Sequence, residues 1–302
     1  MGERNYCRLC PRECGADREI ETGACGCGRT LRIARAAPHY WEEPCISGVR
    51  GSGAVFFSGC NLKCIFCQNK RLSYGYEGVD IDFLRLSEIF IELQEQGVHN
   101  INLVTPTPWS DIIKKALETA WGKGLWLPTV YNTGGYETPE IIRSLRGYIG
   151  VYLPDFKYIS PSLSEKLSGA YDYPEFAKRA LYEMVEQRGE PLFDEEGIMT
   201  KGVIVRHLVL PGETENSFSV LDYLKSEYGD SIYISIMNQY TPMAGAEGEL
   251  SRPLSEEEYN EVLNYAREIG IKNGFIQESG TVKESFIPEW NGLGVLKKEG
   301  KA

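Results

Sequence analysis

Short β-rich runs alternate with stretches of helical periodicity along most of this 302-residue chain, and no other feature limits its fold as strongly. The predicted strands cover 53–58, 101–105, 126–132, 148–154, 202–210 and 232–237. The predicted helices cover 83–96, 110–122, 138–146, 174–189, 215–227 and 255–269. Strand–helix units in series favour a parallel sheet, because each helix returns the chain to the same end of the sheet. We therefore predict an α/β fold, an open sheet or a barrel, with its functional groups at the carboxyl ends of the strands.

The cysteines divide the chain, since all nine lie in the first 67 residues. Residues 1–50 are rich in Cys, Arg and Gly and show little apolar periodicity, so we expect a metal rather than a core to order them. Residues 51–302 then form the α/β domain with a C-terminal extension. Within that domain, residues 186–202 are predicted to form a long exposed insertion.

Composition excludes some function classes. The net charge of −11 disfavours broad binding to nucleic acid, which needs clustered Lys and Arg. The sequence has no signal-peptide-like apolar run and no run of about twenty apolar residues that could cross a membrane. We expect a cytoplasmic protein with neither a membrane nor a nucleic-acid partner. Disulfides are disfavoured in that compartment, so the clustered cysteines indicate metal ligands or reactive thiols.

Three of the cysteines, Cys60, Cys64 and Cys67, follow the first predicted strand with the spacing Cys-x3-Cys-x2-Cys. A structural zinc ion normally takes four protein ligands. Three close thiolates instead suit a [4Fe–4S] cluster in which one iron is left for an outside ligand. The alternative is three cysteines that pack together or bind zinc.

The motif Cys60-x3-Cys64-x-Phe66-Cys67 resembles the signature of the radical S-adenosylmethionine (radical SAM) superfamily. The resemblance implies a partial (β/α)6 barrel in which SAM binds the open iron through its amino and carboxylate groups, with Phe66 among the cofactor-binding residues. It also implies an electron donor of the flavodoxin or ferredoxin type. The reduced cluster would cleave SAM to methionine and a 5′-deoxyadenosyl radical, which abstracts hydrogen from a substrate.

Longer stretches resemble one branch of that superfamily, the PflX-type homologues of pyruvate formate-lyase activating enzyme. The stretches are CRLCPRECGADREIETGACG, EEPCISG, VTPTPW, VYNTGGYE, YLPDFKY and VIVRHLVLPG. Three functions remain open: an activase of a glycyl-radical enzyme, a radical SAM enzyme acting on a small molecule or peptide, and an electron-transfer or metal-binding module. We favour the second, which predicts a pocket closed by residues 275–292.

The resemblance places SAM-binding residues at two further strand ends. Thr105 and Thr107 stand where many radical SAM proteins have a Gly-Gly-Glu-like stretch beside the methionine amino group. Asn132 and Thr133 stand where the activating enzymes have an Asp-Thr-Asn-Gly stretch beside the methionine carboxylate. Ordinary turns are the alternative for both pairs.

Charged residues follow the next two strands. Asp155 and Lys157 match the Asp-x-Lys element of the activating enzymes and, two residues apart, can share one face of a strand. Arg206 interrupts an apolar strand and needs a partner, which the resemblance identifies as the SAM carboxylate. The alternatives are a solvated ion pair for Asp155 and Lys157 and a structural salt bridge for Arg206. His207 should lie on the opposite face and pack against a helix.

A second cysteine set precedes the first strand. Cys7, Cys10, Cys14 and Cys25 could complete a four-thiolate site, structural or electron-conducting, that holds zinc or an auxiliary iron–sulfur cluster. Cys27 competes with Cys25 for the fourth place, and an irregular segment without metal is the alternative.

The remaining candidates have weaker sequence support. We predict structural roles for His39 and His99, packing or a place beside the metal site for Cys45, and adenine contacts at Asn238, Gln239 and Tyr240.

Overall fold

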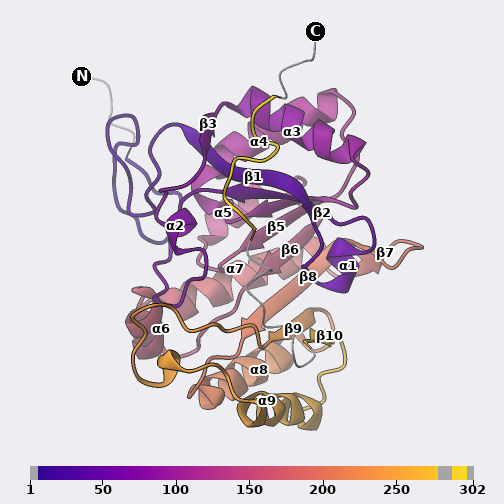
Figure 1. Cartoon of the computed structure of the whole chain (residues 1–302). Coiled ribbons are helices and arrows are strands. Elements are labelled where there is room, and N and C mark those ends of the chain that lie inside the picture. Colours follow the sequence, from indigo (N-terminus) through magenta and orange to yellow (C-terminus); the bar gives the residue numbers. More distant parts are fainter. Residues whose placement is uncertain (1–5, 278–287, 298–302) are drawn as a thin grey trace.

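A ten-stranded sheet forms the centre of the computed structural model, which describes residues 6–277 and 288–297 (Figure 1). Its strands are β1 (Leu31–His39), β2 (Ser52–Phe57), β3 (Val79–Ile81), β4 (Ile101–Val104), β5 (Thr129–Thr133), β6 (Val151–Pro154), β7 (Leu192–Phe193), β8 (Met199–Leu208), β9 (Tyr233–Met237) and β10 (Gly274–Ile276). The spatial order is β10-β9-β8-β6-β5-β4-β2-β1-β3, and β7 pairs with β8. Neighbours from β2 to β10 along this order are parallel, as predicted for β2, β4, β5, β6, β8 and β9, whereas β10 was not predicted.

All six predicted helices are present, with bounds that shift by at most a few residues. The helices are α1 (Pro44–Ser47), α2 (Lys70–Ser73), α3 (Phe83–Glu95), α4 (Ser110–Gly122), α5 (Pro139–Ser144), α6 (Pro161–Ser168), α7 (Tyr173–Arg188), α8 (Thr214–Tyr228) and α9 (Glu256–Glu268), with 3₁₀ turns at Thr107–Trp109 and Gly248–Ser251. Ser255 and Glu258 form a capping box that starts α9. The short helices α1, α2 and α6 were not predicted, because so few residues leave little periodicity to detect.

Strand β1 differs from the prediction for residues 1–50. It pairs antiparallel with β2, so that His39 lies opposite Ser52, and Ile33 and Ala34 are fully buried. The stretch LRIARAAPH alternates arginine with apolar residues over part of its length, which is a strand signal that the richness in Cys and Arg obscured. This part of the Cys-rich segment therefore belongs to the main sheet.

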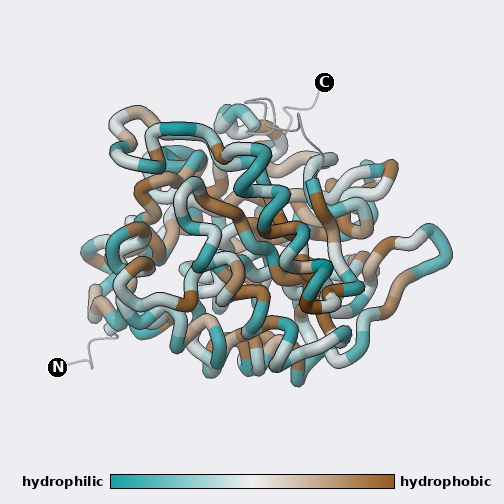
Figure 2. The backbone as a smooth tube through the Cα atoms, turned by 90° about the horizontal axis from the view of Figure 1, so that it is seen from below, coloured by the Kyte–Doolittle hydropathy of each residue, from teal (hydrophilic) through white to brown (hydrophobic). Residues whose placement is uncertain are grey.

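The sheet has two apolar faces. The outer face packs against the long helices and contributes Val55, Tyr131 and Val205 to the largest core cluster. The inner face is covered at the amino ends of the strands by α1, whose Ile46 packs with Val130. Many hydrophobic residues accordingly lie toward the middle of the molecule, while many of the outer turns are hydrophilic (Figure 2).

Two segments outside the strand–helix units have defined positions. The predicted insertion 186–202 comprises the end of α7, a projecting hairpin that contains β7, and the start of β8 (Figure 1). The C-terminal residues 288–297 run beside β1, where Ala36 N–H donates to the Leu293 carbonyl over 2.8 Å. Residues 278–287 of the predicted closing segment 275–292 lie outside the described residues. Within the described ranges, no helix is both long enough and apolar enough to span a membrane.

Candidate active site

A cavity lies on the inner side of the sheet. Its volume of about 380 Å³ is within the usual range for small-molecule sites. The lining residues come from nearly the whole width of the sheet and include His39, Phe56, Val104, Asn132, Arg206, Ser235 and Ile276. Strands so far apart in the spatial order can line one cavity only because the sheet curls. The arrangement is consistent with the predicted partial barrel.

The three cysteines of the motif line this cavity together with Phe66. They lie in the loop that follows β2, and the Gln68 side chain ties that loop to the end of β9 by donating to the Gln239 carbonyl over 2.8 Å. Gly59 starts the loop with φ of 87°, and a Cβ there would collide with Cys27 Sγ. The turn that presents the cysteines therefore requires glycine.

The chemistry of the loop fits a cluster with thiolate ligands. Burial raises the pKa of Cys60 to about 12 and also raises the pKa of Cys67. These thiols therefore stay protonated unless a cation beside them stabilises the thiolate. Iron would supply that charge. No three His, Cys, Asp or Glu side chains in the described ranges are arranged around a point suited to a single metal ion. The loop thus supplies three partly buried thiols, and the described residues form no single-ion site there.

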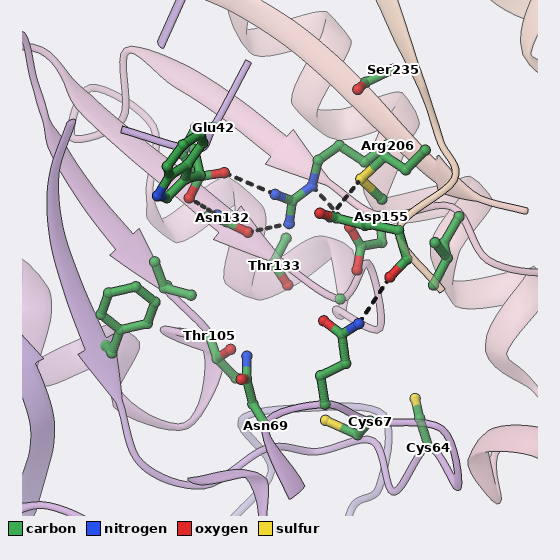
Figure 3. A pocket seen from close by; sticks show the side chains of 18 of the residues that line it. Glu42, Cys64, Cys67, Asn69, Thr105, Asn132, Thr133, Asp155, Arg206 and Ser235 are labelled. Atoms are coloured by element: carbon green, nitrogen blue, oxygen red, sulfur yellow. Dashed lines mark hydrogen bonds and ion pairs between the residues drawn. The ribbon is translucent and has the colours of Figure 1, made fainter. Parts of the chain in front are cut away.

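Arg206 is the centre of a buried polar network across the cavity (Figure 3). Its Nε donates to Asp155 over 3.0 Å, its Nη1 to Glu42 over 3.0 Å and its Nη2 to Asn132 over 2.6 Å. Three of the five guanidinium N–H groups are used in this way, which leaves the others for a ligand. The structural salt bridge that the sequence left open as an alternative is therefore present, and binding of SAM by Arg206 stays a prediction.

Asp155 joins Arg206 to Lys157, whose Nζ lies 2.6 Å from Asp155 Oδ2. Burial alone would raise the pKa of Asp155, but Lys157 and Arg206 outweigh it and hold the pKa below its usual value. Both Asp155 and Lys157 line the cavity and are mostly buried. The solvated ion pair considered from the sequence is therefore not what the structure contains.

Of the polar residues at the ends of β4 and β5, some line the cavity and one, Thr107, is buried outside it. Thr105, Asn132 and Thr133 line the cavity. Thr105 has φ of 60°, a left-handed conformation that is strained for a β-branched residue and occurs mostly at functional sites. Thr107, predicted to bind SAM, lies outside the cavity and donates to the buried carboxyl group of Glu137 over 2.5 Å. The 3₁₀ turn that begins at Thr107 directs it away from the cavity.

Glu137 was not predicted, although it supports the site. Its Oε1 accepts hydrogen bonds from both Thr107 and Thr133, and its Oε2 has no hydrogen-bond partner among the described residues. The side chain is fully buried, and burial raises its pKa to about 7. Sequence reasoning missed this role, because a single glutamate two residues after TGG resembles an ordinary loop charge.

Replacing Glu137 by Gln should change how stability depends on pH. The folded chain holds the Glu137 proton up to about pH 7, whereas the unfolded chain releases it near pH 4.5, so stability falls between these values. Relative to Glu137→Gln, the wild type should lose up to about 3 kcal/mol of unfolding free energy from pH 4.5 to pH 8. Urea unfolding across this range measures the difference. The exposed control Glu140→Gln should follow the wild type, and a Glu137→Gln profile that also does so contradicts the assignment.

Two further carboxyl groups reach the cavity from the turn after β1. Glu42 accepts from Asn102 Nδ2 over 3.0 Å and from Asn132 Nδ2 over 3.1 Å, besides Arg206. Glu43 also lines the cavity and is 7% exposed. The sequence prediction missed both, because two charges beside a proline are typical of a surface loop. Only the return of this turn across the inner face of the sheet buries them.

The N-terminal cysteines lie beside the main cavity. Cys7, Cys10, Cys14 and Cys25 all line one small hollow, whereas Cys27 Sγ lies 3.3 Å from the Ser58 carbonyl. This grouping favours Cys25 over Cys27 as the fourth member of the predicted set. The Cys60 N–H donates to the Cys25 carbonyl over 3.1 Å, so the backbones of the two cysteine sets are in direct contact.

Two arginines hold the Cys-rich segment against the barrel. Arg12 Nε donates to the Asn61 carbonyl over 2.8 Å. Arg18 donates to the Pro108 carbonyl over 2.6 Å and stacks on Trp109, with 4.6 Å from Cζ to the ring centroid. These contacts fix the segment on the cysteine loop and on the loop after β4.

The other candidates take varied positions. His207 is confirmed on the outer face, where its Nε2 lies 2.9 Å from Ser217 Oγ of α8. His99 is buried beside Arg50, as expected for a structural residue. His39 packs edge-on against Phe56 and lines the cavity, where burial lowers its pKa to about 4 and keeps it neutral; its structural role stays a prediction. Cys45 packs in the inner core.

Of the three residues predicted to contact adenine, the cavity includes only Gln239 within the described residues. Tyr240 is buried behind Phe66, with 6.5 Å between ring centroids, and its hydroxyl donates to the Leu250 carbonyl. Asn238 N–H donates to Gln277 Oε1 over 2.8 Å. These two residues therefore support the end of β9 rather than line the cavity.

Comparisons with known proteins agree with this arrangement. The chain is 28% identical over 277 residues to Uncharacterized protein MJ0674 of Methanocaldococcus jannaschii, covering 88% of this chain and 75% of that protein. Streptococcus suis SuiB bound to S-adenosylmethionine has a similar fold, with a TM-score of 0.51, 18% identity and coverage of 73% of this chain. This chain spans 48% of SuiB, about half its length.

A radical SAM methyltransferase from Sphaerobacter thermophilus is also similar in fold, with a TM-score of 0.52 and 14% identity over 78% of this chain and 69% of that chain. At these identities, the structural likenesses concern the fold alone. The sequence comparison is more specific, because the family profile described as Radical SAM superfamily matches residues 54–224, more than half of the chain and including the whole cysteine loop. The chain is therefore a member of the radical SAM superfamily and an enzyme of that type.

Proposed function

We propose that this enzyme cleaves SAM in the cavity and abstracts hydrogen from a small molecule or peptide. The observation that carries the proposal is that Cys60, Cys64 and Cys67 line the same cavity as Asp155 and Arg206. A [4Fe–4S] cluster held by the three thiolates would supply, when reduced, the electron for SAM cleavage. Its reductant would be an electron donor of the flavodoxin or ferredoxin type.

The chain's own residues provide complementary charge for the amino-acid part of SAM. Free N–H groups of Arg206 can donate to a carboxylate, and oxygen atoms of Asp155 can accept from an ammonium group. Lys157 holds Asp155 in position through their 2.6 Å ion pair. Apolar side chains such as Phe56 and Phe66 line the walls and would help to exclude water from a reactive radical.

The residues that line the cavity favour a small-molecule or peptide substrate over a folded protein partner. The described ends of the predicted closing segment line the cavity with Phe275, Ile276, Gln277 and Pro288. The PflX-type resemblance keeps a second candidate, activation of a glycyl-radical enzyme, which needs a mouth that admits a protein loop.

Deuterium transfer separates the two candidates. We expect anaerobic reactions with the reconstituted, reduced chain and SAM to incorporate deuterium into 5′-deoxyadenosine from a deuterated small-molecule or peptide pool. A glycyl-radical signal in a protein fraction, without transfer from the pool, would support the activase instead.

We also propose that Cys7, Cys10, Cys14 and Cys25 hold zinc or an auxiliary iron–sulfur cluster. Four thiolates would close the coordination of either metal, so the site would be structural or electron-conducting. The support is their shared hollow and its contact with the cysteine loop through the hydrogen bond from Cys60 to Cys25.

Metal analysis of a Cys60/Cys64/Cys67 triple-Ala variant tests this second site. We expect about one zinc per chain, or iron with sulfide, to remain bound, because the N-terminal thiolates are unchanged. A further Cys10→Ala change should remove it. A folded triple variant that retains neither metal would contradict the proposal.

A further inference from the structure

Glu43 is the one cavity residue whose carboxyl group remains incompletely paired among the described residues. Ser235 hydrogen-bonds the carboxyl group, but Glu43 Oε2 has no hydrogen-bond partner within residues 6–277 and 288–297. Glu42, its neighbour, has both oxygens satisfied by Asn102, Asn132 and Arg206. A buried polar atom without a partner costs free energy, so such an atom beside a cavity points to a ligand that pairs with it.

The position of Glu43 separates it from the cysteines. Glu43 follows β1, whose last residue, His39, pairs with Ser52 at the start of β2. The cysteine loop follows the other end of β2, which spans roughly 16 Å at the ordinary rise per residue. Ser235, which contacts Glu43, and Glu42 accordingly lie across the cavity from Cys64 and Cys67 (Figure 3). We call the part of the cavity bounded by Glu42, Glu43 and Ser235 the carboxylate end.

The charges of the cavity are unequal when they are all ionised. Among the described lining residues, Glu42, Glu43 and Asp155 face two cations, Lys157 and Arg206. His39, the titratable group on β1, is held neutral by burial, which lowers its pKa to about 4. Asp155 is shared between both cations and Glu42 is bonded to Arg206. Burial raises the pKa of Glu43, and Arg206, which is already shared with Asp155 and Glu42, offsets this only in part. Glu43 is therefore the carboxyl group that a cation in the cavity would hold ionised.

We infer that Glu43 binds a cationic nitrogen, such as an amine, of the substrate. The inference rests on the proposed function and adds to it the chemical class of the substrate. A cationic N–H group would pair with Glu43 Oε2 and balance the excess negative charge of the carboxylate end. The cysteine loop at the other end of the cavity remains available for the cluster and SAM.

Deuterated small-molecule pools from the source organism provide the test. A pool is divided on a cation exchanger into a retained, cationic fraction and an unretained fraction. Each fraction is given to the reconstituted full chain with SAM and a reductant, and the ratio of deuterated to undeuterated 5′-deoxyadenosine is measured. We expect the retained fraction to give a ratio at least about tenfold higher, because a cationic N–H group both donates to Glu43 Oε2 and offsets its charge, which makes a stronger hydrogen bond than a neutral donor does.

Variants then assign the preference to Glu43. Glu43→Gln should lower the ratio with the retained fraction about tenfold, since it removes the charge at constant size. Glu43→Asp, which keeps the charge but withdraws it by one methylene, should give an intermediate ratio. The exposed control Glu195→Gln should behave as the wild type. Thermal melting confirms that each variant folds, and the comparison of fractions with the wild type holds even if one does not.

Several results would overturn the inference. The first is a deuteration ratio with the unretained fraction that equals or exceeds the ratio with the retained fraction. The second is SAM cleavage without deuterium transfer from either fraction. The third is a deuteration ratio for Glu43→Gln equal to that of the wild type. A tenfold loss of SAM affinity in Glu43→Gln would assign the carboxyl group to SAM instead. Failure of the wild type to cleave SAM at all would refute the proposed function, and the inference with it.

Discussion

Replacing Cys64 by Ala is expected to abolish the formation of 5′-deoxyadenosine from SAM. Cys64 is one of only three thiols in the loop after β2, and its Sγ lies 2.9 Å from Ser168 Oγ at the edge of the cavity. With two thiolates left, the loop cannot provide the three ligands that such a cluster needs. Chromatography of anaerobic reactions with reconstituted protein measures the product.

Cys45→Ala is the matched control for this change. Cys45 is a buried thiol that packs in the inner core near Ile46 rather than in the cysteine loop. It should keep both its iron content and its SAM cleavage near those of the wild type. Wild-type product formation by Cys64→Ala would refute the assignment of the loop as the cluster site.

Arg206→Ala is expected to lower both stability and SAM affinity. It leaves the buried carboxylates of Glu42 and Asp155 without their shared cation, which should cost about 3–5 kcal/mol of unfolding free energy. Loss of a charged hydrogen bond to the SAM carboxylate should weaken binding by about 1.5–3 kcal/mol. Urea unfolding measures the first effect, and calorimetric titration with SAM measures the second.

Arg179→Ala is the control for Arg206→Ala, because its ion pair with Glu175 is exposed and should contribute at most about 1 kcal/mol. Lower stability with unchanged SAM affinity would make Arg206 a structural residue alone. A stability loss no larger than that of Arg179→Ala would contradict the buried network.

The sequence predicted six of the parallel strands, because a strand with both faces covered is a largely apolar run, whereas the short and mostly exposed β10 was missed. In β8 the apolar run is interrupted by two polar residues, which were correctly separated into Arg206, toward the cavity, and His207, toward α8. Strand β1 was missed, since its two arginines and the surrounding cysteines dilute the apolar pattern. Its antiparallel pairing depends on β2, a contact that no local pattern specifies.

The candidate site could be predicted only in part, for a related reason. Motifs identified the cysteine loop and the residues at strand ends, because strand ends meet at one edge of a parallel sheet. Glu42, Glu43 and Glu137 come from turns, and their burial depends on where the chain returns. Thr107 shows the converse: Thr105, two residues earlier, lines the cavity, but a 3₁₀ turn directs Thr107 to Glu137.

The central claim is that SAM binds beside a cluster held by the cysteine loop, and electron paramagnetic resonance tests it most directly. The reconstituted, reduced chain should give a [4Fe–4S] signal whose g values change when SAM is added, because SAM would occupy the open iron. The Cys60/Cys64/Cys67 triple-Ala variant should lose the SAM-sensitive signal. A wild-type cluster signal that SAM leaves unchanged at saturating concentration would contradict the account.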